Sequence, residues 1–493
     1  MIEGVKVFEG ISIREWRGAI PASIHGLTGD SRTIQSGDLF VALRGESFDG
    51  HDFLDQAAEN GACAAVVERF NDAASIPQIL VENTLAALPH LAANFYDHPA
   101  RELKIYGITG SNGKTTSSYL LESILQANGH KTAVIGTIEY RYAGKRMDAP
   151  NTTPLPHDMQ RLLRDIVDSG VRHVIMEVSS HGLALHRVDE IRIGVALFTN
   201  LSQDHLDFHK NMDDYRETKK RLFTDYLTGD GVSVLNLDDL TGRRYAQELQ
   251  GRSIMTFAID RDADMRARDM ELLLNGSRFT LETHRGDRVP LQTPLIGRHN
   301  ASNILAAAAA AWAGGVSLDV IRRGIENVQA VPGRLESIPN GVSAQIVVDY
   351  CHTPDALEKC LHTLNAIPHE RILTIFGCGG DRDRAKRPLM GEIALRFSDK
   401  VFVTSDNPRT EDPQRIIDDI LAGMTHDANR YVVIPDRREA IRAGVQELQP
   451  GDLLLIAGKG HETYQILGRI KTPFDDRLIT LEYLQQAGKE AQA

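Results

Sequence analysis

The sequence predicts an α/β protein of three domains, and two observations lead to this prediction. The 493 residues correspond to three domains at about 150 residues each. Short apolar runs typical of buried strands alternate with helical patterns along the chain, which is typical of mostly parallel sheets covered by helices. Hydrophobic residues make up 42% of the chain, which is enough for ordinary globular cores.

The first two predicted domains cover residues 1–98 and 99–333. Strand-like runs at 37–43 and 62–67 and a helical stretch at 53–60 indicate a small α/β domain at the N-terminus. The central domain contains apolar runs that each precede a polar turn, at 105–108, 174–178, 195–199 and 232–235. Ligands gather at the carboxyl ends of the strands in a mostly parallel sheet, so these turns are candidate binding sites. An alanine-rich run at 304–313 predicts a tightly packed interior helix.

Residues 334–493 predict a Rossmann-like C-terminal domain. A helical pattern covers 354–364, and strand-like runs occur at 346–348, 372–376, 400–403 and 453–456. The Gly-x-Gly-x-x-Gly fingerprint of dinucleotide-binding domains does not occur in this segment.

The most informative segment is LKIYGITGSNGKTT at 103–116, an apolar strand that leads through a glycine-rich turn into a helix. Backbone N–H groups in such a turn cradle nucleotide phosphates, so the central domain is predicted to be P-loop ATPase-like. Lys114 would meet the β/γ-phosphate charge, and the hydroxyl of Thr115 would bind Mg²⁺. The residues assigned to ATP here are Gly110, Ser111, Asn112, Gly113, Lys114, Thr115 and Thr116. The alternative is a chance glycine-rich turn, since Ile108 stands where the usual pattern has its first glycine.

Two further turns follow strands of the same predicted sheet. Glu177 lies at the end of the run 174–178 and is a plausible second carboxylate for a phosphate-bound Mg²⁺. The loop at 198–209 adds polar side chains to the same crevice: Asn200, Asp204, His205 and Asp207. The alternative for any one of them is a cap or a surface group.

Composition narrows the class of protein. The net charge of −12 argues against non-specific binding to nucleic acid. The longest apolar run, at 304–313, is half the length of a membrane span. No secretory signal is visible, because the N-terminal segment carries Glu3, Glu9 and Glu15. The four cysteines show no paired metal spacing. We therefore expect a cytoplasmic monomer with reduced thiols, no membrane insertion and no nucleic-acid partner.

A series of motifs in chain order resembles the successive motifs of the Mur ligases. They are GITGSNGKTT at 107–116, EVSSHGL at 177–183, NLSQDHLDFH at 200–209, LIGRHNASN at 295–303, PGRLE at 332–336 and DYCHTPD at 349–355. Three more motifs resemble those of family members that add the third amino acid, meso-diaminopimelate: GCGGDRD at 377–383, DNPR at 406–409 and GKGHE at 458–462.

The resemblance implies an ATP-dependent ligase of peptidoglycan precursor synthesis. ATP would phosphorylate the D-glutamate side chain of UDP-N-acetylmuramoyl-L-alanyl-D-glutamate, and an amine of meso-diaminopimelate would then displace phosphate. Three alternatives are an L-lysine-adding member, a folylpolyglutamate-synthase-like ligase and a non-catalytic nucleotide-binding regulator. The regulator would be expected to lack Glu177, His205 or Lys219, all of which are present.

The resemblance also implies the metal-binding and catalytic residues. Mg²⁺ would be held by Thr115, Glu177 and His205, and by a carbamate on Lys219, which lies in a Tyr-x-x-x-Lys segment that begins at Tyr215. Lys114 would complete the catalytic set. On the residues alone, Lys219 to Arg221 form a charge run that is usually a solvated helix face.

The remaining implied contacts concern binding. For ATP they are Asn300, Asn303, Arg334 and Asp349. For the UDP-sugar dipeptide they are Ser31, Glu46, Ser47, Phe48, Asn151, Thr152, Thr153, Ser179 and Arg187. For diaminopimelate they are Arg382, Asp406, Asn407, Pro408, Arg409, Gly458 and Glu462. An alternative for Arg409 is a surface ion pair with Glu411.

The chain departs from the family's motifs at three positions. Ser111 replaces a common threonine and Cys351 a common alanine, and both are small. Leu185 stands where a glutamine contacts substrate, and a leucine side chain cannot form that hydrogen bond.

Overall fold

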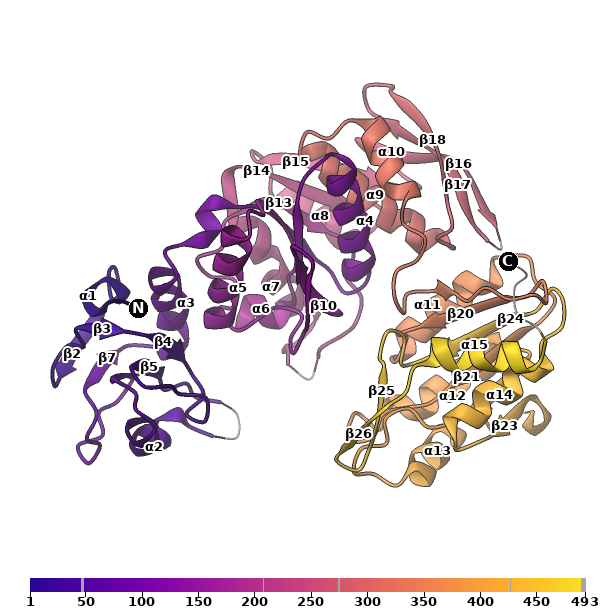
Figure 1. Ribbon diagram of the computed structural model, residues 1–493. Coiled ribbons are helices and arrows are strands. Elements are labelled where there is room, and N and C mark those ends of the chain that lie inside the picture. The colour runs from indigo at the N-terminus through magenta and orange to yellow at the C-terminus, as the bar shows by residue number, and fades with distance from the viewer. Residues whose placement is uncertain (46–47, 207, 274, 426, 489–493) are drawn as a thin grey trace. The chain divides into compact units, whose positions relative to one another are not determined.

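The computed structural model describes residues 1–45, 48–206, 208–273, 275–425 and 427–488 (Figure 1). The chain divides into two compact units, one of residues 1–257 and 306–321 and one of residues 258–305 and 322–493. The unit boundaries fall inside three elements, β15 (Ser253–Ala258), α9 (Arg298–Ala313) and α10 (Leu318–Glu326).

The first unit begins with a five-stranded sheet in the order β2-β7-β6-β5-β4. β2 pairs antiparallel with β7, and the other neighbours pair parallel. Its strands are β2 (Ile13–Arg17), β4 (Gly26–Thr28), β5 (Asp38–Val41), β6 (Ala64–Val67) and β7 (Gln78–Val81). The accompanying elements are β1 (Ile2–Glu3), β3 (Ser23–Ile24), α1 (Gly4–Val7), α2 (Leu54–Glu59), α3 (Thr84–Phe95) and the 3₁₀ helix η1 (Gly50–Phe53). Two apolar clusters bury the sheet on its two faces.

A second sheet of this unit has the strand order β11-β10-β9-β12-β8-β13-β14-β15. From β9 to β15 all neighbours pair parallel, whereas β10 and β11 are antiparallel. The strands are β8 (Lys104–Thr109), β9 (Thr132–Ile135), β10 (Glu139–Tyr142), β11 (Lys145–Asp148), β12 (His173–Glu177), β13 (Ile193–Phe198) and β14 (Leu227–Asn236). The helices are α4 (Lys114–Ala127), α5 (Pro156–Asp168), α6 (Ser180–Ala184), α7 (Met212–Thr224), α8 (Leu240–Glu248) and the 3₁₀ helix η2 (Pro99–Glu102).

The second unit contains a three-stranded antiparallel meander and a six-stranded sheet in the order β19-β20-β24-β21-β22-β23. β19 is antiparallel to β20, and the other neighbours in the six-stranded sheet are parallel. The meander strands are β16 (Met265–Leu273), β17 (Gly276–Thr283) and β18 (Arg288–Thr293). The sheet strands are β19 (Glu336–Ser337), β20 (Gln345–Asp349), β21 (Ile372–Phe376), β22 (Lys400–Val403), β23 (Tyr431–Val433) and β24 (Leu453–Ala457).

Helices cover both faces of the six-stranded sheet (Figure 1). One face packs against α11 (Pro354–Asn365), α12 (Lys386–Phe397) and α13 (Pro413–Leu421). The other packs against α14 (Arg437–Glu447) and α15 (Asp476–Gln486). The unit also contains η3 (Ala428–Arg430) and a hairpin of β25 (Tyr464–Leu467) and β26 (Ile470–Pro473). This doubly covered parallel sheet confirms the Rossmann-like prediction.

The predicted elements are confirmed, with shifts at their ends. The runs at 372–376 and 400–403 coincide with β21 and β22, whereas the run at 232–235 lies within a longer β14. The alanine-rich helix α9 begins at Arg298, before its apolar run, so its first turn is polar. Gly297, directly before the helix, adopts a left-handed conformation (φ 90°), and this sets where the helix begins. Within the described residues, the helices lack the combined length and apolar character that crossing a membrane requires.

A fully buried ion pair joins the two helices on one face of the six-stranded sheet. Arg437 Nη2 lies 2.7 Å from Asp476 Oδ2, and both side chains are inaccessible to solvent. The Arg437 guanidinium also donates to the backbone oxygens of Ser405 and Ala457, at 3.4 and 2.9 Å. This arginine therefore supports the chain just before the turns that follow β22 and β24.

We expect Arg437→Met to destabilise the second unit by about 3 to 5 kcal/mol, because it leaves the Asp476 carboxylate buried without a charge partner. Thermal unfolding of the full chain measures this loss. The control is Arg438→Met, whose partner Glu482 is exposed, and which should cost about 1 kcal/mol or less. Equal losses in the two variants would contradict the prediction.

Candidate nucleotide and substrate sites

The glycine-rich turn predicted from the sequence joins β8 to α4. Gly110 (φ 145°) and Gly113 (φ 86°) both adopt backbone conformations that favour glycine. A Cβ atom at Gly110 would lie 1.9 Å from Thr199 Oγ1, so no side chain fits there. The amides after Gly110 lead into the N-terminus of α4, where a helix favours anions.

The loop after β13 holds this turn in place. Asn200 accepts hydrogen bonds from the backbone of Ser111 (2.9 Å, by its carbonyl) and of Asn112 (3.0 Å, by its Oδ1). Thr199 Oγ1 donates to Asn112 O at 2.6 Å. Ser111 Oγ also donates to Ser202 O at 3.1 Å. The serine hydroxyl therefore ties the turn to the loop after β13, although threonine is common at this position in the family.

Two lysine side chains converge on one backbone oxygen of the turn. Lys114 Nζ donates to Gly110 O at 2.8 Å and to Ser111 O at 3.0 Å. Lys219, on α7, donates to the same Gly110 oxygen at 3.2 Å and lies over the ring of Tyr215. Two lysine amines therefore lie beside the turn that the sequence assigns to phosphates.

Lys219 is buried, with 1% of its surface exposed. The solvated-face interpretation of the charge run at 219–221 is therefore wrong for this residue, because α7 turns it toward the phosphate turn. Burial, and then the nearby Lys114 charge, hold the pKa of the Lys219 amine well below its usual range. Neutral amine is thus readily available at this position.

Glu177 is a buried carboxylate, 1% exposed, at the end of β12. Thr115 and Thr137 donate their hydroxyl protons to its Oε2 at 3.1 and 2.9 Å, and Thr137 N donates to Oε1 at 3.2 Å. A Cβ atom at Gly136 would lie 2.4 Å from Oε1. Among the residues that the structure describes, no basic side chain forms a salt bridge with Glu177.

This donor set fits Mg²⁺, which prefers carboxylate and hydroxyl oxygens. The hydroxyl of Thr115 and the carboxylate of Glu177 already face each other, as the sequence predicts. Thr137 is a residue that the sequence reasoning missed. It follows β9 in a turn without a recognisable motif, so no local signal marks it.

His205 lies in the loop after β13, in a left-handed conformation (φ 54°). Its Nε2 is 3.5 Å from Asp204 Oδ2, and its ring is 5.0 Å from that of His181 and 6.1 Å from that of Tyr215. Tyr215 OH lies 3.1 Å from Ser111 Oγ. His205 therefore lies on the same side of the sheet as the phosphate turn, and Asp207 lies outside the described residues.

The predicted central contacts of the UDP-sugar dipeptide form one connected group next to Glu177. Thr153 Oγ1 donates to Glu177 O at 3.1 Å and receives a hydrogen bond from Ser179 N at 3.0 Å. Arg187 donates to Thr153 O at 3.0 Å, and Thr152 Oγ1 lies 3.1 Å from that of Thr137. Burial lowers the pKa of Arg187.

The remaining predicted dipeptide residues are more scattered. Asn151 precedes this group and accepts a hydrogen bond from Tyr140 OH through its carbonyl oxygen. In the N-terminal sheet region, Ser31 is buried and donates to Gln56 Oε1 at 2.9 Å, and Phe48 is 64% exposed. Glu46 and Ser47 lie outside the described residues. Leu185 caps the C-terminus of α6.

The second unit places the predicted amino-acid site at the carboxyl ends of β21, β22 and β24. Asn407 Nδ2 donates to Glu462 Oε2 at 2.8 Å. Asp406 is 7% exposed, and its Oδ2 has no hydrogen-bond partner among the described residues. A Cβ atom at Gly458 would lie 2.6 Å from that oxygen, so glycine leaves room for the buried carboxylate.

Lys459 is a second residue that the sequence reasoning missed. Its side chain is fully buried, and its Nζ lies 2.9 Å from Glu462 Oε2 and 3.2 Å from Asn407 Oδ1. The amine therefore orients both of these predicted substrate contacts. The only available signal was its place in the GKGHE motif. A lysine between two glycines otherwise resembles an exposed turn residue, which is why it was missed.

Arg409 lies in a left-handed conformation (φ 52°), which its backbone bonds to β25 and the turn after it enforce. Its N donates to Ile466 O at 3.0 Å, Gly468 N donates to Arg409 O at 2.7 Å, and its Nη1 donates to Gly380 O at 2.8 Å. The ion-pair alternative is wrong, because the partners of Glu411 are Arg384 and Arg387. Pro408 precedes this residue, and the exposed Arg382 donates to Asp381 O.

The predicted ATP contacts of the second unit fall into two groups. Asn303 Nδ2 donates to Asn300 Oδ1 at 3.2 Å in the first turns of α9, and both are buried. Asp349, at the end of β20, accepts hydrogen bonds from Leu335 N and Cys351 N at 2.7 and 2.8 Å. The guanidinium of Arg334 lies 5.0 Å from the centre of the Tyr350 ring.

Comparison with known proteins gives matches along most of the chain. The Mur ligase family, catalytic domain, matches residues 23–96, the Mur ligase middle domain residues 108–311, and the Mur ligase, glutamate ligase domain, residues 333–460. The chain is 45% identical over 491 residues to a UDP-N-acetylmuramoyl-L-alanyl-D-glutamate–2,6-diaminopimelate ligase of Geobacter metallireducens, covering 95% of both chains. It is 42% identical over 464 residues to the protein of the same name from Geobacillus kaustophilus, covering 93% and 94%.

Solved structures give the same result. A structure of a UDP-N-acetylmuramoyl-L-alanyl-D-glutamate–2,6-diaminopimelate ligase is 33% identical, with a TM-score of 0.72, covering 99% of this chain and 100% of that one. MurF from Acinetobacter baumannii (23% identity, TM-score 0.68, 98% of both chains) shares the fold. A folylpolyglutamate synthase of Mycobacterium tuberculosis also shares the fold, at 18% identity and a TM-score of 0.61, over 76% of this chain and 92% of that one.

We expect Gly110→Ala to weaken binding of a non-hydrolysable ATP analogue and to destabilise the first unit by about 1 to 3 kcal/mol, because the new methyl group overlaps Thr199. Calorimetric titration and thermal unfolding measure the two effects. Gly229→Ala is the control, since a Cβ there meets nothing within 4 Å. If both variants bind the analogue as the wild type does, the turn is not the phosphate site.

Proposed function

The chain belongs to the Mur ligase family, and from that membership we propose that it joins meso-diaminopimelate to UDP-N-acetylmuramoyl-L-alanyl-D-glutamate at the expense of ATP. Similarity to relatives named for this reaction, at 45% identity over 95% of both chains, is the observation that carries the proposal. The protein is thus an ATP-dependent ligase of peptidoglycan precursor synthesis.

The reaction has two steps. The γ-phosphoryl group of ATP passes to the D-glutamate side-chain carboxylate, which gives an acyl phosphate and ADP. The amine of diaminopimelate then attacks the acyl carbon, the C–O bond to phosphate breaks, and an amide, inorganic phosphate and a proton are formed. The protein contributes mainly position and charge to such a transfer, which is what a glycine turn and a convergent lysine can provide.

Lys114 is proposed to leave the carbonyl oxygens of Gly110 and Ser111 and to meet the phosphates when ATP binds. Its present bonds, at 2.8 and 3.0 Å, hold the amine beside the turn. The amides of the turn and the N-terminus of α4 would bind the same phosphates. Asn300, Asn303, Arg334 and Asp349 are the proposed further contacts to the nucleotide.

Mg²⁺ is the proposed metal cofactor, and Thr115 and Glu177 are its proposed ligands. When bound, this ion neutralises negative charge on the phosphates. The buried Glu177 carboxylate supports the assignment, because it lacks a basic partner among the described residues and is already surrounded by hydroxyl groups. His205 and a carbamate on Lys219 are the proposed ligands of a second Mg²⁺.

The carbamate requires a neutral amine, and the environment of Lys219 favours one. Burial and the charge of Lys114 lower its pKa. Addition of CO₂ to the neutral amine forms a bond from the lysine nitrogen to carbon and releases one proton, which converts an uncharged amine into an anionic oxygen ligand. Among the described residues, no carboxylate forms a salt bridge with Lys219 that would favour the protonated form.

The proposed dipeptide site joins the group at Thr152, Thr153, Ser179 and Arg187 to the same edge of the sheet as Glu177. The proposed further contacts to the UDP-sugar are Asn151, Ser31, Glu46, Ser47 and Phe48.

We also propose that the domains cover residues 1–98, 99–333 and 334–493, and that the enzyme acts as a monomer in the cytoplasm.

In the C-terminal domain, Arg409 is proposed to bind the distal carboxylate of diaminopimelate. Its planar guanidinium can form two parallel hydrogen bonds with a carboxylate, a group that L-lysine lacks at that end. The buried Asp406 Oδ2, which has no hydrogen-bond partner among the described residues, and the Asn407–Glu462 pair would bind the distal amine. Arg382, Pro408 and Gly458 would complete the pocket.

We expect Lys219→Ala to fold but to lose most ligase activity, because the second metal site loses an anionic ligand. Replacing the neighbouring Lys220 by alanine is the matched control, since this lysine is 23% exposed and pairs with Glu217 and Glu248. Turnover assays compare the variants, and intact mass measured in bicarbonate detects the carbamate on the wild type. Undiminished turnover in Lys219→Ala would rule out this role.

For Arg409→Ala we expect kcat/KM for diaminopimelate to fall by the equivalent of about 2 to 5 kcal/mol, as when one partner of a buried charge pair is removed. Binding of the UDP-dipeptide should be nearly unchanged. The control is Arg442→Ala, which removes an exposed ion pair on α14.

An amino-acid substrate panel with the same assay separates the alternatives. A wild type that prefers L-lysine would identify a lysine-adding member and overturn the assignment of Arg409. ATP hydrolysis stimulated by folate rather than by the UDP-dipeptide would indicate a folylpolyglutamate-synthase-like ligase.

A further inference from the structure

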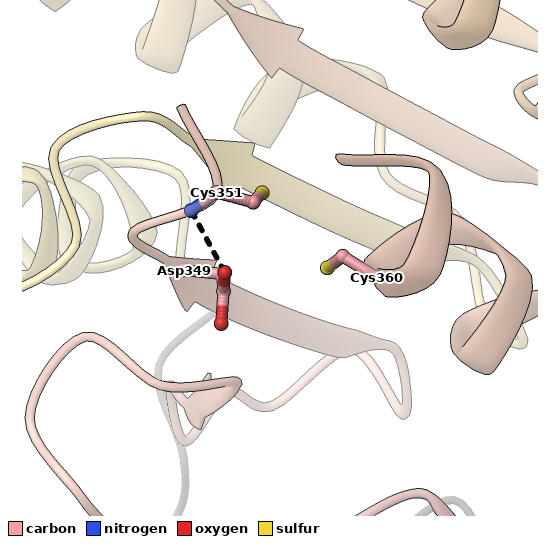
Figure 2. A group of neighbouring side chains, drawn as sticks. All are labelled: Asp349, Cys351 and Cys360. Atoms are coloured by element: carbon pink, nitrogen blue, oxygen red, sulfur yellow. Dashed lines mark hydrogen bonds between the residues drawn. The ribbon is translucent and has the colours of Figure 1, made fainter. Parts of the chain in front are cut away.

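Two buried cysteines and a carboxylate lie together at the carboxyl end of β20 (Figure 2). One ligand atom from each of Asp349, Cys351 and Cys360 lies within 4.8 Å of the other two. Cys351 follows β20 and Cys360 lies in α11, and their separation along the chain is not a paired metal-binding spacing. The fold brings them together because α11 packs back against the strand that precedes it.

We propose that Asp349, Cys351 and Cys360 form a binding site for a thiophilic divalent cation such as Zn²⁺ or Cd²⁺, with a fourth position open to water. A tetrahedral zinc site has metal–ligand bonds of about 2.0 to 2.3 Å, which places its ligand atoms about 3.5 to 3.8 Å apart. The three ligand atoms, now within 4.8 Å of one another, would have to move about 1 Å closer together to reach this spacing. Two sulfur donors favour a soft cation over Mg²⁺, which prefers oxygen ligands.

The carboxylate is already oriented for such a role. Cys351 N donates to Asp349 Oδ1 at 2.8 Å, as Figure 2 shows, and Leu335 N donates to Oδ2 at 2.7 Å. Each oxygen keeps a second lone pair for a metal. Hydrogen bonds of this kind to a metal ligand fix its direction and strengthen binding.

The thiols are buried among apolar side chains, at 3% and 6% exposure. Their mutual hydrogen bond, together with burial, raises the pKa of Cys351. Both thiols are therefore protonated until a metal arrives, and binding of one cation releases one proton from each.

Occupation of this site would change the charge at Asp349. If the proposed function holds, Asp349 is also an ATP contact, and its Oδ2 fixes the turn at 333–335 through Leu335 N. A bound cation would neutralise the carboxylate and compete for it. The site would then inhibit ATP use at cation concentrations that leave Mg²⁺ in excess.

Titration of the metal-free full chain with Cd²⁺ alone, in the absence of ATP, tests the site. Thiolate–cadmium bonds give a charge-transfer absorption in the ultraviolet, which we expect to saturate at one Cd²⁺ per chain. Cys351→Ala and Cys360→Ala should each lose this absorption. The controls Cys63→Ala and Cys378→Ala change the other two cysteines and should retain it. Alanine is common at position 351 in related motifs, so Cys351→Ala is expected to fold, and thermal unfolding checks all four variants.

No absorption in the wild type, or absorption that persists in Cys351→Ala or Cys360→Ala, would overturn the site. A ligase assay at saturating Mg²⁺ tests its effect: Cd²⁺ should raise KM for ATP at least several-fold in the wild type and leave Cys351→Ala unchanged. An equal effect on both proteins would overturn the inhibitory role. Absence of ligase activity without Cd²⁺ would instead contradict the proposed function, and the absorption titration would still decide the site.

Discussion

The parallel register of β8 with its two neighbours is the constraint on which the proposed nucleotide site depends. Glu177 lies opposite Ile108, and Phe198 lies opposite Thr109, so three strands end at the same edge of the sheet. The phosphate turn, the Glu177 carboxylate and the loop that begins at Thr199 are consequently neighbours although they are far apart in sequence. Because Gly110 packs directly against Thr199, the turn cannot shift without disturbing β13 as well.

The distribution of buried charge separates supporting residues from reactive ones. Arg437 with Asp476, and Lys459 with Glu462, form ion pairs that orient the backbone or other side chains. Glu177 and Lys219 are equally buried, but among the described residues neither forms a salt bridge. A buried carboxylate without a basic partner is costly, so the retention of Glu177 beside the predicted phosphate turn indicates a function. A cation at Glu177 would remove this cost, and addition of CO₂ would turn the neutral Lys219 amine into an anionic metal ligand.

Most elements could be predicted from the sequence, because apolar runs and glycine turns are local signals. The strands at 372–376 and 400–403 and the turn at Gly110 are examples. Burial of individual polar residues could not be predicted, since it depends on tertiary packing. Lys219 looks like part of a charged helix face until α7 is placed against the phosphate turn. The thiol cluster is invisible for the same reason, because a strand-to-helix connection separates its two cysteines.

The proposed amino-acid site shows how a side chain can be held by hydrogen bonds to the backbone rather than by packing. Arg409 adopts a left-handed conformation that costs an arginine about 1 kcal/mol or more. Main-chain hydrogen bonds to Ile466 and Gly468 offset that cost, and the Gly380 carbonyl fixes the guanidinium. The hairpin of β25 and β26 thus determines where the guanidinium lies. If Arg409 binds the amino-acid substrate as proposed, its selection depends on this hairpin as much as on Arg409, although the hairpin carries none of the residues proposed to contact that substrate.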